Sequence, residues 1–223
     1  MTQEAAHIDV SPMFKTGVEK EPILLLDVTG SNGEPAAPGS SVRRLDVILE
    51  ALPQIVAVLG AEDSQAADEQ AAAGDDEAGG LMTITFASNT AKVLGDLNPE
   101  NITQKLREIQ WGGTTYIMPG WELVVENYME EFGDTPITER PHLLCLCITD
   151  GEALDTDQFA QVLSQTKGGI YIAVAVLGYG PAHDAALAAY QQIATTNKHV
   201  RVVTFGATTN ADEIAQGLLS IAQ

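Results

Sequence analysis

Residues 27–33, Asp-Val-Thr-Gly-Ser-Asn-Gly, bring together side chains that could hold a metal ion. Asp27, Thr29 and Ser31 alternate along the chain and offer one carboxylate and two hydroxyl oxygens. Such hard donors suit Mg²⁺, Mn²⁺ or Ca²⁺, whereas zinc and copper favour imidazole and thiolate. Two glycines within the segment allow the loop to fold back so that the three side chains converge. The alternative is a strand end at which Asp27 and Thr29 only cap the next helix.

The side chains of a metal site can meet only if the strands that carry them end at the same edge of the sheet. A continuous apolar run, residues 23–26, ends abruptly at Asp27 and is typical of a buried parallel strand. A second apolar run, residues 142–148, ends in Thr149-Asp150-Gly151 in the same way. Parallel strands end at one edge of their sheet, and ligands of open α/β sheets bind at that edge. We therefore expect Asp27 and Asp150 to converge.

The rest of the chain alternates between strand and helix patterns. Further strands are expected at 81–87, 90–94, 169–177 and 200–205, and helices at 42–59, 99–109, 121–132, 155–164, 184–194 and 212–222. Residues 81–87 and 90–94 resemble a hairpin, which predicts an antiparallel edge. The sequence thus predicts an α/β fold with a doubly wound, mostly parallel six-stranded sheet and helices on both faces.

The domain organisation follows from composition. Residues 1–20 lack periodicity and are expected to form an N-terminal arm, followed by one domain at 21–223. Residues 61–80 mix Ala, Gly and Gln with acidic residues and no basic one, which favours a solvated, flexible acidic insert. The helix before this insert is expected to be kinked or divided by Pro53. Its predicted apolar stripe is Val42, Leu45, Leu49, Leu52, Val56 and Leu59.

Charge and hydropathy exclude several classes of partner. The formal net charge is −20, which would repel nucleic acid and anionic membranes. The sequence has neither a membrane-spanning run nor a recognisable signal pattern, so a cytoplasmic protein without membrane insertion is expected. Cys145 and Cys147, the only cysteines, alternate within an apolar run and are interpreted as core residues.

A third segment, Trp-Gly-Gly-Thr-Thr-Tyr-Ile-Met-Pro-Gly at 111–120, places hydroxyl groups before a helix. Together with Asp27-Val28-Thr29-Gly30-Ser31 and Ile148-Thr149-Asp150-Gly151, it resembles the metal ion dependent adhesion site of the von Willebrand factor type A family. That pattern is Asp-x-Ser-x-Ser, a distant Thr, and a distant Asp before Gly. Thr29 departs from the usual serine and is similar to the copine branch, although the lipid-binding domains of copines have no counterpart here.

The resemblance implies metal ligands at Asp27, Thr29, Ser31, Thr115 and Asp150. In the family the hydroxyl groups bind the ion directly, and the acids bind it directly or through water. Thr114 and Thr115 both fit the distant threonine, and Thr115 is favoured because Pro119 and Gly120 follow it at the expected spacing. The implied ion is Mg²⁺, with Mn²⁺ or Ca²⁺ as alternatives.

The favoured function is a metal-dependent module that binds an Asp or Glu of a protein partner, and not an enzyme. An open position on the ion would accept the partner's carboxylate. The alternative is a Mg²⁺-dependent phosphoryl transferase or hydrolase with Asp27 as nucleophile, but Thr29 stands where such enzymes need a second acid. The sequence shows no convincing catalytic set, and Gly178-Tyr179-Gly180 is a poor dinucleotide motif because His183 replaces the third glycine.

Overall fold

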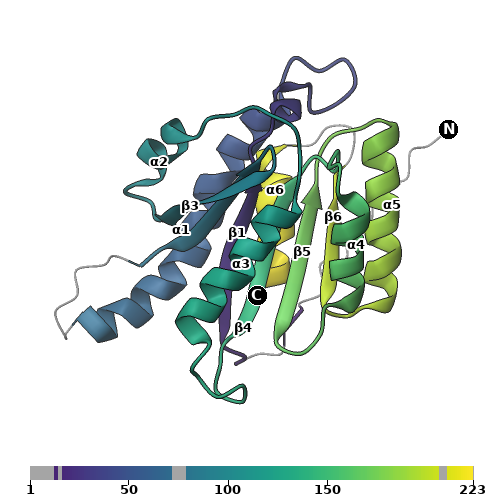
Figure 1. Cartoon of the computed structure of the whole chain (residues 1–223). Coiled ribbons are helices and arrows are strands. Elements are labelled where there is room, and N and C mark those ends of the chain that lie inside the picture. Colours follow the sequence, from purple (N-terminus) through teal and green to yellow (C-terminus); the bar gives the residue numbers. More distant parts are fainter. Residues whose placement is uncertain (1–12, 15–16, 72–78, 206–209, 223) are drawn as a thin grey trace.

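The computed structural model describes residues 13–14, 17–71, 79–205 and 210–222 (Figure 1). Within them the chain forms a six-stranded sheet in the order β3-β2-β1-β4-β5-β6. All neighbouring strands are parallel except β2 and β3, which form an antiparallel hairpin at one edge. The strands are β1 (Lys20–Asp27), β2 (Leu81–Ala87), β3 (Thr90–Leu97), β4 (His142–Thr149), β5 (Ile170–Val176) and β6 (Val200–Thr204). The predicted fold class is confirmed.

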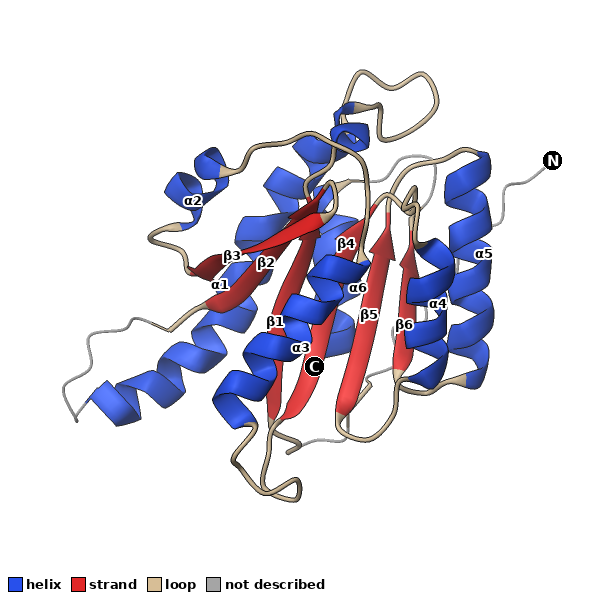
Figure 2. Ribbon diagram, viewed as in Figure 1, coloured by secondary structure: helices blue, strands red, loops and turns tan. Residues whose placement is uncertain are grey.

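Helices cover both faces of this sheet. Figure 2 shows α3 (Met118–Phe132) and α4 (Thr156–Gln165) in front of the strands and α1 (Arg44–Ala71) behind them. Side chains alternate between the two faces along β1, so Leu24 and Leu26 join one core cluster and Leu25 joins the other. The remaining helices are α2 (Ile102–Glu108), α5 (Pro181–Thr196) and α6 (Ala211–Ala222).

The centre of the sheet positions the site. β1 and β4 are neighbours, and Leu26 pairs with Ile148 in their register. Asp27 and Thr149 therefore end their strands side by side. The chain leaves β1 toward β2 and leaves β4 toward β5, so the strand order reverses between β1 and β4. Such a switch point is where open α/β sheets leave a crevice for ligands.

Helix α1 differs from the sequence prediction in three respects. It begins at Arg44 and passes through Pro53 as one helix. It continues to Ala71, so the expectation of a loop is wrong for residues 61–71, whose Ala, Gln and Glu residues favour helix. Its buried apolar side chains are Val47, Ile48, Ala51, Leu52, Ile55, Val56 and Leu59, whereas Val42 lies before the helix and is exposed. The part of the predicted insert at 72–78 lies outside the described residues.

The predicted arm at 1–20 is described only in part. β1 begins at Lys20, one residue before the expected boundary of the domain. Phe14 is buried, and its ring centroid lies 4.4 Å from that of Tyr171. Cys145 and Cys147 are fully buried core residues, and burial raises the pKa of both thiols. None of the helices in the described ranges is long and apolar enough to cross a membrane.

Candidate functional site

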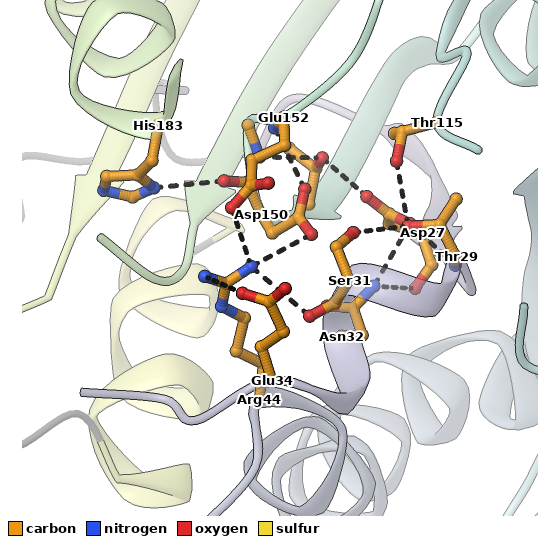
Figure 3. Close-up of polar contacts among 12 residues, drawn as sticks. Asp27, Thr29, Ser31, Asn32, Glu34, Arg44, Thr115, Asp150, Glu152 and His183 are labelled. Carbon is orange, nitrogen blue, oxygen red and sulfur yellow. Dashed lines mark hydrogen bonds and ion pairs between the residues drawn. The ribbon is translucent and has the colours of Figure 1, made fainter. Parts of the chain in front are cut away.

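The loop after β1 folds around the carboxylate of Asp27. The backbone N–H of Thr29 donates a hydrogen bond to Asp27 Oδ1 at 2.9 Å, and the Thr29 hydroxyl donates to the same oxygen at 2.6 Å. A short 3₁₀ helix, η1 (Gly30–Gly33), then brings Asn32 back, and its amide donates to Asp27 Oδ1 at 3.1 Å. The loop therefore folds back on the carboxylate of Asp27, as the sequence predicts (Figure 3).

Three hydroxyl groups gather beside this carboxylate. Thr29 Oγ1 lies 3.1 Å from Ser31 Oγ and accepts a hydrogen bond from Thr115 Oγ1 at 3.0 Å. Thr29 and Thr115 are separated by 86 residues in the sequence. We call Thr29, Ser31 and Thr115 the hydroxyl cluster.

The loop that carries Thr115 is fastened to the loop after β1. Gly112 N donates to the carbonyl oxygen of Val28 at 2.9 Å, and Gly30 N donates to that of Gly113 at 3.2 Å. Gly113 has φ of +83°, and a Cβ there would lie 2.2 Å from Ser88 Oγ. The positive φ favours glycine at this position, and the missing side chain lets the loop lie against Ser88 in the turn between β2 and β3.

Thr115, and not Thr114, faces the hydroxyl cluster. Thr115 is buried, with 5 % of its surface exposed, whereas Thr114 is exposed to solvent. The Asp155 carboxylate fixes the turn that follows, because it accepts the backbone N–H groups of Ile117 and Met118, each at 2.9 Å. Sequence reasoning placed Asp155 at the start of α4 and missed this contact, since nothing local links it to a helix 37 residues earlier.

Asp27 lies in an environment that opposes its ionisation. It is fully buried, and burial first and the charge of Asp150 second raise its pKa from 3.8 to about 7. Hydrogen bonds from Thr29 and Thr149 act in the opposite direction, and that of the Thr149 hydroxyl reaches Oδ2 at 2.9 Å. A cation beside this carboxylate would relieve the cost of charging it.

Asp150 is paired with a buried arginine that the sequence analysis missed. Arg44 is 1 % exposed, and its Nη1 donates to Asp150 Oδ2 at 3.2 Å and to Glu152 Oε1 at 3.1 Å. Its Nη2 lies 3.7 Å from Glu34 Oε2. We call Arg44, Asp150, Glu152 and Glu34 the arginine cluster, which lies beside the hydroxyl cluster in Figure 3. An arginine at the first turn of an amphipathic helix carries no local signal of such a role.

His183 has a structural contact in the same region. Its Nδ1 lies 3.0 Å from the carbonyl oxygen of Asp150, which can only accept, so the histidine donates. The ring therefore supports the loop after β4 from the first turn of α5.

Two oxygen separations in the hydroxyl cluster are compatible with the spacing of ligands around a small divalent cation. Neighbouring ligands of octahedral Mg²⁺ lie about 3 Å apart when each is about 2.1 Å from the ion. The separations of 3.0 and 3.1 Å from Thr29 Oγ1 match this spacing. The described residues contain no group of three or more His, Cys, Asp or Glu side chains that could hold a metal. A cation here would therefore depend on hydroxyl oxygens.

Comparison with known proteins gives a result at the level of the fold. No family model and no curated protein matches the chain. A solved VWA domain of SpRpn10 aligns with a TM-score of 0.59 at 11 % identity, over 90 % of this chain and 94 % of that one. Manganese-loaded TRAP protein of Plasmodium vivax aligns with a TM-score of 0.55 at 16 % identity, over 89 % of this chain and 72 % of that one.

An aerotolerance-related membrane protein of Bacteroides fragilis gives a similar match. Its TM-score is 0.55 at 18 % identity, over 91 % of this chain and 100 % of the other. Identities this low establish the arrangement of the elements and not a shared activity. From its strand order, its covering helices and these alignments, the chain has the α/β fold of von Willebrand factor A domains.

Proposed function

We propose that this protein is a metal-dependent interaction module that binds an acidic side chain of a protein partner. A divalent cation, Mg²⁺ in the first place, would be held by the hydroxyl groups of Thr29, Ser31 and Thr115. Asp27 and Asp150 would bind it directly or through water. The ion would supply an electrophilic position for the partner's carboxylate, and the protein would supply the geometry.

One observation carries the proposal. Thr115 reaches Thr29 across 86 residues of sequence, at the carboxyl edge of the sheet and at the switch point between β1 and β4. The hydroxyl oxygens of Ser31 and Thr115 both lie within 3.1 Å of Thr29 Oγ1. A strand end that only capped a helix would not need this long-range contact, and η1 shows no side-chain cap from Thr29.

The charge of a bound divalent ion would attract a carboxylate of the partner and repel a cationic side chain. The donors within the hydroxyl cluster are neutral, so a bound ion would keep much of its charge. The whole chain carries a formal charge of −20 and repels acidic partners at long range. Short-range coordination would have to overcome that repulsion, and added monovalent salt should weaken binding little or even strengthen it.

A peptide selection tests this function. Displayed peptides are selected on the protein in Mg²⁺, and each binder is measured again in EDTA and with its Asp or Glu changed to the amide. We expect both changes to abolish binding. The protein variant Asp27→Ala should lose binding and keep its fold, which circular dichroism checks. Peptides that bind equally well in EDTA and as amides would contradict the proposal.

A catalytic role for Asp27 has less support. Both of its carboxylate oxygens accept hydrogen bonds, and the residue is fully buried. A nucleophile needs an open path to its substrate, and Thr29 stands where such enzymes need a second acid. We therefore propose a binding function and not phosphoryl transfer.

A further inference from the structure

We propose that Arg44 is an internal cation that limits metal binding by holding Asp150 in the arginine cluster. The proposal rests on the proposed function, because it concerns the affinity of the same site for its ion. It assigns Arg44 as a positioning residue: it acts through Asp150 and Ser31, which are two of the five proposed ligands.

The first observation is that the oxygens of Asp150 are already occupied. Arg44 Nη1 donates to Oδ2 at 3.2 Å, and the backbone N–H of Glu152 donates to Oδ1 at 2.9 Å. Asp150 is fully buried, so its carboxylate cannot turn to solvent. A metal ion bound directly by Asp150 would share this carboxylate with the guanidinium, and the two positive charges would repel each other.

The second observation is that Arg44 also contacts the loop of the hydroxyl cluster. Its Nη1 lies 3.4 Å from the carbonyl oxygen of Ser31. One guanidinium group thus joins the loop after β1 to the loop after β4. A fixed positive charge here both orders the two loops and repels an incoming cation.

The third observation is a space in the fold shaped for this side chain. Gly178, in the loop after β5, has φ of +108°, and a Cβ there would lie 2.6 Å from Arg44 Nε. The centroid of the Tyr179 ring lies 5.8 Å from Arg44 Cζ. The guanidinium is therefore enclosed by three loops, and the close approach of backbone at Gly178 keeps it against Asp150.

In these contacts the positive charge of Arg44 offsets part of the negative charge of the surrounding acids without a metal ion. Arg44 is the buried basic residue among the acids Asp150, Glu152 and Glu34, each within 3.7 Å of it. A metal ion and the guanidinium would compete for the same carboxylate. Loss of Arg44 should therefore release Asp150 and strengthen metal binding, although it removes contacts that order the loops.

Titration calorimetry with MnCl₂ alone on the full chain tests the proposal. We expect Arg44→Gln to lower the Kd for Mn²⁺ by about tenfold or more, because it removes a positive charge and frees a carboxylate. Arg43→Gln is the matched control, since it removes the same charge from an exposed neighbour whose partner is Asp46. It should leave the Kd within about twofold, because exposed charges are screened.

Further variants separate positioning from a merely structural role. A structural role predicts weaker metal binding in Arg44→Gln, which would overturn the proposal, as would an unchanged Kd. In the Asp150→Asn background the gain from Arg44→Gln should shrink, because only the loss of charge repulsion remains. A full gain there would refute the role of Asp150. Arg44→Lys keeps the charge, and its Kd for Mn²⁺ should lie between those of wild type and Arg44→Gln. If Arg44→Gln does not fold, Arg44→Lys is measured in its place.

The same titrations keep this proposal distinct from the proposed function. If wild type binds Mn²⁺ and Arg44→Gln binds it no more tightly, only the role of Arg44 fails. If Arg44→Gln binds Mn²⁺ and wild type does not, the role of Arg44 is supported and the proposed function fails for the natural chain. If neither binds it, both fail.

Discussion

Two adjacent threonines show how finely the candidate site depends on position. Thr114 and Thr115 have the same chemistry, but only Thr115 is buried against Thr29. The backbone carbonyl of Thr114 instead accepts a hydrogen bond from Ser88 N at 2.6 Å. Thr115 is therefore a candidate metal ligand through its side chain. Its neighbour Thr114 contributes only a backbone hydrogen bond, which any residue could make.

Replacing each of these threonines by valine, which removes only a hydroxyl group, tests that difference. We expect Thr115→Val to weaken Mn²⁺ binding by about tenfold or more, the scale of one lost ligand contact of about 1.4 kcal/mol. Thr114→Val should bind as wild type does, because its backbone contact is kept. Calorimetry measures both, and equal losses in the two variants would contradict the assignment of Thr115.

At the scale of elements, loops from distant strands brace one another. Leu154 N donates to the carbonyl of Thr115 at 2.9 Å, and Asp155 accepts from the first N–H groups near the start of α3. These contacts satisfy backbone donors that a helix start leaves free. The loop after β4 therefore carries Asp150 and also orders the segment that presents Thr115.

The loss of this brace should be measurable. Asp155→Ala leaves the buried N–H of Ile117 and the half-buried N–H of Met118 without this acceptor, so we expect it to lower the free energy of unfolding by about 1–3 kcal/mol. Asp157→Ala is the control: it removes the same charge from an exposed position in the first turn of α4, and it should cost about 0.5 kcal/mol. Urea unfolding compares them. Similar losses in the two variants would show that Asp155 acts only on α4.

At the scale of the whole molecule, the described core clusters include residues of α1 only as far as Leu59. The described buried face of α1 runs from Val47 to Leu59. Beyond it the sequence to residue 78 is rich in Ala, Gln and acidic residues. Such a composition contributes little apolar surface to a core.

We therefore expect a short Gly/Ser linker in place of residues 61–78 to change the free energy of unfolding by no more than about 1 kcal/mol. Ile55→Ala, in the buried part of the same helix, should instead cost about 2–5 kcal/mol and calibrates the measurement. Thermal and urea unfolding give both values. A loss of several kcal/mol on linker replacement would mean that the acidic segment packs on the domain.

The sequence by itself determined the class of the fold and the edge at which the site lies. Apolar runs that end in acids identify buried parallel strands, and the rules of chain connection then bring Asp27 and Asp150 to the same edge. These inferences need only local periodicity and topology. They did not predict the extension of α1 to Ala71, because a polar segment rich in Ala and Glu fits both a solvated helix and a loop.

Only the tertiary structure decided which side chains meet at that edge. It turned Thr115 toward Thr29, enclosed Arg44 beside Asp150 and directed Asp155 to α3. Arg44 and Asp150 are 106 residues apart, and each has many possible partners in the sequence. Their pairing depends on the register of β1 and β4 and on the space beside Gly178, which are properties of the packed chain and of no local pattern.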